Sequence, residues 1–111
     1  MSNLLSSSVY FMVQPGGTLC GTVPIPGDKS ISHRAIMLAA LAEGTTHITG
    51  CLLGADVLAT LRALRAMGVV TSDEFAAEDL RVQGVGMHGL QVPQQPLDLG
   101  NSGTSMRLLC G

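Results

Sequence analysis

The residues best suited to chemistry form one continuous stretch, Pro26 to Arg34, which reads Pro-Gly-Asp-Lys-Ser-Ile-Ser-His-Arg. Gly27 allows a tight turn, and the first backbone N–H groups of the apolar helical run behind it have no intrahelical partner. A helix start of this kind attracts anions, phosphate above all. Lys29 adds a point charge, and Arg34 adds a planar fork for two oxygens of one phosphate or carboxylate. The alternative is an ordinary capped helix with a solvated basic start, but so many converging donors favour an anion site.

A second stretch, residues 97–107, repeats this chemistry before another apolar run. The Gly, Ser and Arg at positions 27, 32 and 34 recur 73 residues later as Gly100, Ser105 and Arg107. These matches indicate an internal duplication. If both helix starts face one cleft, they could hold a dianionic or twin-anion substrate. The second apolar run, residues 108–111, is too short for a stable helix, so we expect the chain to be cut within its second repeat.

Other kinds of site fit the residues poorly. A P-loop is excluded because Asp28, not Gly, precedes Lys29, and no GxGxxG supports a dinucleotide site. The three histidines are scattered, so they predict structural or exposed side chains rather than a Ser/His/Asp set or metal ligands. The three cysteines form no CxxC pair, which predicts reduced thiols and no metal site. These residues are His33, His47, His88, Cys20, Cys51 and Cys110.

The composition is unusual for a free-standing domain. The 111 residues are enough for one domain at most. Only 13% of them are charged, against about 25% in soluble domains, so we expect a partner or further chain to cover part of the surface. A net charge of −2 argues against nucleic-acid binding. No apolar run is long enough to span a membrane, and residues 1–8 show no export signal. We therefore expect a cytoplasmic protein without membrane contact.

The periodicity of the sequence predicts a βαβαββ unit of the α/β class, in which Gly44 and Gly68 end the two helices. The first helix is apolar all round and should be buried on most sides. In the second helix, Asp56 near the start suits the helix dipole. We expect strands at 9–13, 18–23, 45–51, 69–71 and 80–83, helices at 32–43 and 55–67, an inward apolar stripe of Val57, Leu58, Leu61 and Leu64, and a solvated acidic loop at 73–79.

The two stretches resemble the N-terminal motifs of the 5-enolpyruvylshikimate-3-phosphate synthase family. The residues that carry this resemblance are the motif at 26–34, Leu-Gly-Asn-Ser-Gly-Thr at 99–104, Gly-Ala-Asp-Val at 54–57 and Leu-Arg-Ala-Met-Gly at 64–68. The match extends from about Gln14 to Gly111. UDP-N-acetylglucosamine enolpyruvyl transferase shares the fold, but it has an Asn after the lysine and no His-Arg pair, so it is less similar.

The resemblance implies an inside-out α/β barrel of two domains, each built from three βαβαββ units. Residues 1–25 would then be N-terminal strands that pack with the missing C-terminal domain, and residues 26–111 would be the first unit and the start of the second. The implied reaction transfers the enolpyruvyl group of phosphoenolpyruvate to the 5-hydroxyl of shikimate 3-phosphate. It needs no metal or organic cofactor. The implied enzyme is a monomer, and its partners are these substrates and the remainder of its own chain.

The resemblance also assigns roles to residues of the first motif. Lys29 should be catalytic and contact both substrates. Ser30 and Arg34 should hold shikimate 3-phosphate. Asp56 matches a family acid that caps its helix or supports the site from behind.

In the second motif, the N–H of Gly103 should hold phosphoenolpyruvate, with Asn101 and Thr104 shaping that pocket. Arg107 matches a family arginine close to the site. The remaining substrate-binding and acid–base residues of the family lie beyond Gly111, so we expect this chain alone to be inactive. The alternative is a non-catalytic anion-binding or interaction module from a truncated gene.

Overall fold

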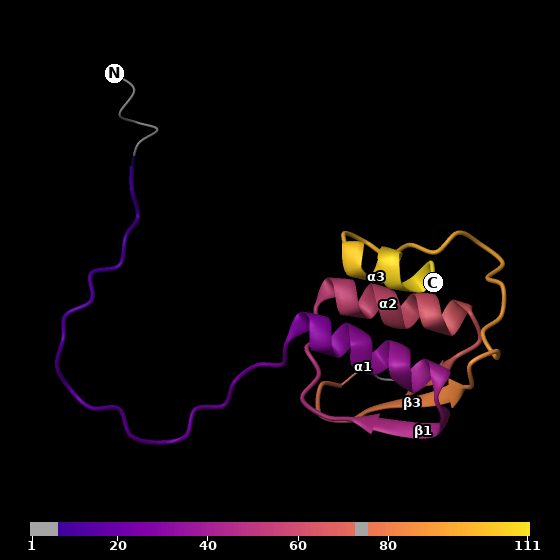
Figure 1. The fold of residues 1–111 in the computed structure, drawn as a ribbon, viewed down its shortest axis with the longest axis horizontal. Coiled ribbons are helices and arrows are strands. Elements are labelled where there is room, and N and C mark those ends of the chain that lie inside the picture. The colour runs from indigo at the N-terminus through magenta and orange to yellow at the C-terminus, as the bar shows by residue number, and fades with distance from the viewer. Residues whose placement is uncertain (1–6, 73–75) are drawn as a thin grey trace.

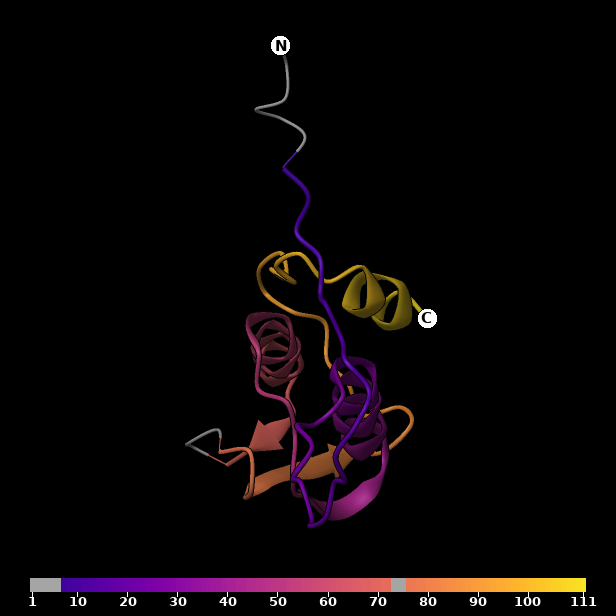
Figure 2. The same ribbon diagram turned by 90° about the vertical axis from the view of Figure 1, so that its left-hand side faces the viewer.

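The computed structural model describes residues 7–72 and 76–111. Its helices α1 and α2 lie between a small sheet and the short helix α3 (Figures 1 and 2). The elements are α1 (Lys29–Leu41), β1 (Glu43–Ile48), α2 (Ala55–Ala66), β2 (Val70–Thr71), β3 (Leu80–Val85) and α3 (Gly103–Leu109). None of the helices in these described ranges has the length and apolar character that a membrane crossing needs.

The sheet is antiparallel throughout, in the order β1-β3-β2. Glu43 pairs with Val85 at one end of the β1–β3 ladder, and Ile48 pairs with Leu80 at the other. Side chains alternate across the sheet, so Leu80 and Val82 of β3 both enter the core. The buried apolar cluster also includes Ile36, Ala39, Ala40, Cys51, Val57, Leu61, Leu64 and Val69.

Helix α1 begins three residues earlier than predicted, because the Asp28 side chain caps it by accepting a 2.9 Å hydrogen bond from the N–H of Ile31. The prediction that Gly44 ends this helix is wrong. Ala42 is the C-cap, and Gly44 lies inside β1 with φ of +90°. The sheet explains the early ending, since the N–H of Gly86 bonds the Ala42 carbonyl oxygen and β1 pairs from its first residue.

Burial of α1 also differs from the prediction of a helix covered on most sides. One face carries Ile36 and Ala40 into the core with 0% exposed surface. On the opposite face, Ile31 is 60% and Leu38 is 67% exposed. Within the described residues, α1 is therefore covered along one face only.

Helix α2 confirms its prediction closely. Val57, Leu61 and Leu64 are buried, and Leu58 packs against the core. At its end, the N–H of Val69 bonds the Leu64 carbonyl oxygen and the N–H of Gly68 bonds that of Arg65. With Gly68 at φ of +96°, this is a Schellman ending, which requires a residue that tolerates the left-handed conformation.

The N-terminal segment, residues 7–26, forms no strand, is exposed and extends away from the rest of the chain (Figure 1). The strands predicted at 9–13 and 18–23 are thus absent from this structure, and the order of the described elements is αβαββα. A strand needs a neighbour for its N–H and C=O groups, and the side chains of Val9, Phe11 and Leu19 are almost wholly exposed. Pairing of residues 1–25 with a C-terminal domain stays a prediction.

The predicted strand at 45–51 forms as β1, two residues earlier in the chain, and the predicted strands at 69–71 and 80–83 form as β2 and β3. Part of the predicted acidic loop, residues 73–75, lies outside the described residues. Asp79, at the end of that loop, is exposed and pairs with His47 and Arg81.

Candidate functional site

The starts of all three helices lie at the same end of the molecule, on the left in Figure 1. Lys29, Ala55 and Gly103 are the first residues of these helices. Helix starts carry partial positive charge and unpaired N–H groups. The structure therefore brings the two predicted anion-binding stretches to one end of the fold and adds the start of α2 between them.

Lys29 and Asp56 form an ion pair that joins the start of α1 to the start of α2. The Lys29 side chain is 51% exposed, and that of Asp56 is 21% exposed. The hydrogen bond from Lys29 is the main reason that the pKa of Asp56 lies below its ordinary value, against the opposing effect of burial. The charges of Lys29 and His33 and a backbone hydrogen bond from Asn101 lower this pKa further.

Asp56 therefore lies between the two predicted motifs. Lys29 of the first motif pairs with it, and in the second motif a Cβ at Gly100 would lie 3.8 Å from its Oδ1 atom, next to Asn101, whose backbone lowers its pKa. A small pocket of about 160 Å³ lies at this junction and is lined by Lys29, Asp56, Leu52, Gly54, Ala55 and Val57. The sequence assigned Asp56 only a capping or supporting role. Its contact with Lys29 spans 27 residues, and no local pattern predicts such a pair.

The first motif is anchored by backbone contacts at Gly27 and Ser32. A Cβ at Gly27 would lie 2.3 Å from the carbonyl oxygen of Gly50, so only glycine fits this approach. Ser32 donates a 2.7 Å hydrogen bond to the Asp28 carbonyl oxygen and accepts a 2.9 Å bond from the N–H of Leu52. Both residues hold the loop at 50–52 under the start of α1.

The other predicted substrate residues of the first motif, Ser30 and Arg34, are exposed on α1. Because Ser32 and His33 are buried between them, the motif alternates between anchoring residues and residues that remain available to a ligand.

In the second motif, Asn101, Gly103 and Arg107 are exposed, and Thr104 is half-buried. The N-cap of α3 is Ser102, whose side-chain oxygen accepts a 3.0 Å hydrogen bond from the N–H of Ser105. A Cβ built on Gly103 meets, among the described residues, no atom within 4 Å outside its own chain neighbours and helix backbone. The space in front of this helix start is therefore open.

A buried polar cluster that the sequence did not predict lies behind these helix starts. It consists of His33 from α1, Thr60 from α2 and Ser105 from α3, each with 0% exposed surface. Burial is the main cause that lowers the pKa of His33, and the charge of Lys29 adds to it while Asp56 opposes it. The sequence predicted that His33 is either structural or exposed, and the structure shows it buried. The one signal that could have indicated the cluster is Ser105, which matches Ser32 in the repeated pattern.

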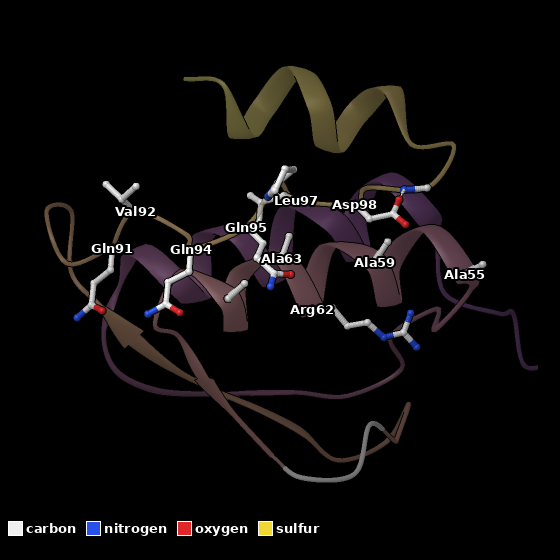
Figure 3. Close-up of a pocket in the computed structure, with 13 residues that line it drawn as sticks. Ala55, Ala59, Arg62, Ala63, Gln91, Val92, Gln94, Gln95, Leu97 and Asp98 are labelled. Carbon is white, nitrogen blue, oxygen red and sulfur yellow. Dashed lines mark hydrogen bonds between the residues drawn. The ribbon is translucent and has the colours of Figure 1, made fainter.

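A larger groove of about 600 Å³ lies between α2 and residues 91–100 (Figure 3). Its lining includes four alanines of α2, three glutamines, Arg62 and Asp98. None of the predicted site residues lines this groove. The candidate site is therefore the smaller pocket at the helix starts, where the charged groups meet.

Comparison with known proteins gives a consistent result. A family model described as EPSP synthase (3-phosphoshikimate 1-carboxyvinyltransferase) matches residues 13–111. A protein of that enzyme name from Alkalilimnicola ehrlichii is 66% identical over 101 residues, which are 91% of this chain and 22% of the relative. One from Hydrogenovibrio crunogenus is 53% identical over 107 residues, or 96% of this chain and 24% of the relative.

A solved structure titled EPSP synthase from Acinetobacter baumannii aligns with a TM-score of 0.74 and 57% sequence identity. The alignment covers 80% of this chain and 20% of that structure. This chain thus spans between a fifth and a quarter of the length of the proteins that it matches.

Proposed function

We propose a function for this chain from the premise that it belongs to the EPSP synthase (3-phosphoshikimate 1-carboxyvinyltransferase) family, whose model matches residues 13–111. The protein that carries it transfers the enolpyruvyl group of phosphoenolpyruvate to the 5-hydroxyl of shikimate 3-phosphate and releases phosphate. The reaction is an addition followed by an elimination, and it uses neither a metal nor an organic cofactor. It belongs to the shikimate pathway, which supplies chorismate and the aromatic amino acids.

The observation that carries this proposal is the junction of Lys29, Asp56 and Asn101 at the shared end of the helices. Both substrates are anions, and both motifs that would bind them contribute to this junction. An ammonium group has three N–H donors. Since Asp56 takes one of them, two remain for the two substrates, and the carboxylate keeps the Lys29 side chain aimed at the open pocket.

The remaining roles follow the exposed positions of the two motifs. Ser30 and Arg34 bind shikimate 3-phosphate from α1. The N–H of Gly103 binds phosphoenolpyruvate, and Asn101 and Thr104 shape that pocket.

Arg107 lies one turn further along α3, where its charge attracts either substrate. The acid and base for proton transfer come from the part of the protein that follows these motifs. We further propose that the complete enzyme is a cytoplasmic monomer that binds neither nucleic acid nor membranes.

A chimera tests this proposal directly. The 101 aligned residues of this chain would replace their counterpart in the Alkalilimnicola ehrlichii relative, and phosphate release would be measured with both substrates. We expect turnover within about tenfold of the unmodified relative, because the supporting contacts lie inside the exchanged segment. The 111 residues alone serve as a control and should release no phosphate.

The competing function is a non-catalytic module that binds anions or another protein. A folded chimera that binds phosphate but has no turnover would support this alternative and reject the proposed transfer reaction. Circular dichroism and thermal unfolding of the chimera distinguish this result from simple misfolding.

A further inference from the structure

The buried cluster of His33, Thr60 and Ser105, with Ser102 beside it, joins all three helices by hydrogen bonds. The Thr60 hydroxyl lies 2.9 Å from His33 Nδ1, and the Ser105 hydroxyl lies 3.2 Å from the same atom. Thr60 and Ser105 also bond each other, and Ser102 Oγ donates to Ser105 Oγ over 2.8 Å. One polar side chain from each helix thus meets at a single point.

Helix α3 depends on this cluster more than the other helices do. Ser105 is its only buried residue among the seven, and Leu109 is only partly buried against the core. An apolar contact fixes position loosely because it is not directional, whereas a buried hydroxyl must keep its partners or lose its hydrogen bonds without compensation. The position of α3 is therefore set mainly by a polar contact.

The hydrogen bonds also determine which ring nitrogen of His33 carries the proton. Nε2 is buried, and no residue in the described ranges 7–72 and 76–111 offers it a hydrogen-bond partner. If Nδ1 donates to Thr60, the hydroxyls form one directed chain in which Ser102 donates to Ser105, Ser105 to Thr60 and Thr60 to the Asp56 carbonyl oxygen. Every donor then has an acceptor. The other tautomer would leave a buried N–H on Nε2 unpaired, which costs more than an unpaired lone pair.

We propose that His33, Thr60 and Ser105 are positioning residues that fix the substrate-binding start of α3 relative to that of α1. His33 lies one turn after Lys29 in α1 and directly before Arg34. Ser105 lies two residues after Gly103. The inference rests on the proposed function, because it concerns the distance between the sites for the two substrates.

Kinetics of variants in the chimera test this positioning. Ser105→Ala and His33→Leu should each raise the KM for phosphoenolpyruvate by about tenfold and that for shikimate 3-phosphate by less than about threefold, because α3 shifts while α1 keeps its own anchors. His33→Asn should restore most of the affinity, since its amide can donate near the position of Nδ1 without adding charge.

Thr71→Val is the matched control, because Thr71 is also buried but lies in β2, away from the cluster. It should lower the unfolding temperature and leave both KM values unchanged. If Ser105→Ala and His33→Leu behave in the same way as this control, the cluster is merely structural and the proposal is overturned.

A second measurement does not depend on activity. Nitrogen NMR of the His33 ring in the chimera should show a neutral ring protonated at Nδ1 at pH 7.5. Because burial and the charge of Lys29 lower its pKa, against the opposing charge of Asp56, the ring should gain a second proton only at a lower pH than an exposed histidine does. A ring that titrates near 6.5, like an exposed histidine, would show that His33 is not held in the buried cluster and would overturn the proposal. An inactive chimera with the expected NMR result would reject the proposed function alone.

Discussion

The starts of α1 and α3 carry matching residues, but the rest of the molecule supports them very differently. Helix α1 has 13 residues, six of them buried, and its start rests on the loop at 50–52 through Gly27 and Ser32. Helix α3 has seven residues, one of them buried. The start of α1 is therefore held by many buried contacts, whereas the start of α3 is held by few.

The matched serines show what this difference means. Ser32 bonds its own motif and the neighbouring loop at Leu52, so it stabilises α1 locally. Ser105 bonds side chains of the other two helices. The same residue at the same place in the pattern thus holds one site rigid by itself and makes the other dependent on its neighbours. Two stretches with matching residues can therefore be supported in different ways by the rest of the fold.

The largest expected effect is the loss of turnover when Lys29, at the start of α1, is replaced. Lys29→Met in the active chimera should lower kcat/KM by about 10³-fold, because two charge-assisted contacts worth about 1.5–3 kcal/mol each are lost. Phosphate release measures this loss. Arg62→Met removes a positive charge from the exposed face of α2 and should keep near-normal turnover. Equal effects of the two variants would mean that Lys29 acts only through net charge.

The next largest effect is on stability, where one added methyl group should affect the starts of α1 and α3 differently. Gly27→Ala should destabilise the chimera by about 3 kcal/mol, since the new Cβ would lie 2.3 Å from the Gly50 carbonyl oxygen and the backbone must move. The free energy of unfolding in urea measures the change. A variant as stable as the parent would show that the loop at 50–52 yields easily, and that the first start is no more rigid than the second.

Gly103→Ala makes the same change at the second start with a different expected result. In the part of the chain that the structure describes, no atom beyond the neighbouring residues and the backbone of α3 itself lies within 4 Å of the new Cβ. The free energy of unfolding should therefore change by less than about 0.5 kcal/mol. The methyl group would enter the space proposed for phosphoenolpyruvate and should weaken its binding by about tenfold. Dissociation constants for both substrates decide the outcome. Equal weakening of the two would assign Gly103 a turn role only.

The sequence predicted those features that depend on neighbouring residues. The 3.6-residue period of Val57, Leu61 and Leu64 identified α2, and Gly68 identified its end, because both signals are local. The prediction that Gly44 ends α1 was wrong, although a glycine after a helix is a common C-cap. Here the ladder between β1 and β3 ends the helix first, and that pairing joins residues 42 apart at Glu43 and Val85.

The candidate site was predicted in its residue types but not in its connections. The motif around Lys29 predicts an anion-binding role for this residue. The ion pair with Asp56 and the cluster around His33 each join residues at least 27 positions apart. Such contacts depend on how the helices pack, and one sequence contains no direct signal for helix packing. Strands at 9–13 and 18–23 failed for a related reason, since a strand requires a partner that local propensity cannot supply.

The smallest expected effects concern pH, and they distinguish the exposed junction from the buried cluster. Asp56 has a pKa below 3.8 in the folded protein. Its stabilising contribution is therefore complete above pH 3.8, and it is lost as the pH falls through the lowered pKa. His33 has a pKa below 6.5. The unfolded chain binds a proton first, so stability starts to fall as soon as the pH drops below 6.5.

Urea unfolding of the chimera between pH 7.5 and 3 should resolve these two windows. Relative to the parent, His33→Asn should lose the decline that begins near pH 6.5 and keep the one below pH 3.8. Asp56→Asn should show the opposite pattern. Lys29→Met removes the positive charge that acts on both groups, so it should raise both folded pKa values and weaken both declines. If Lys29→Met changes neither window, Lys29 is not held at the junction in solution, and the first start is less rigid than its backbone contacts indicate.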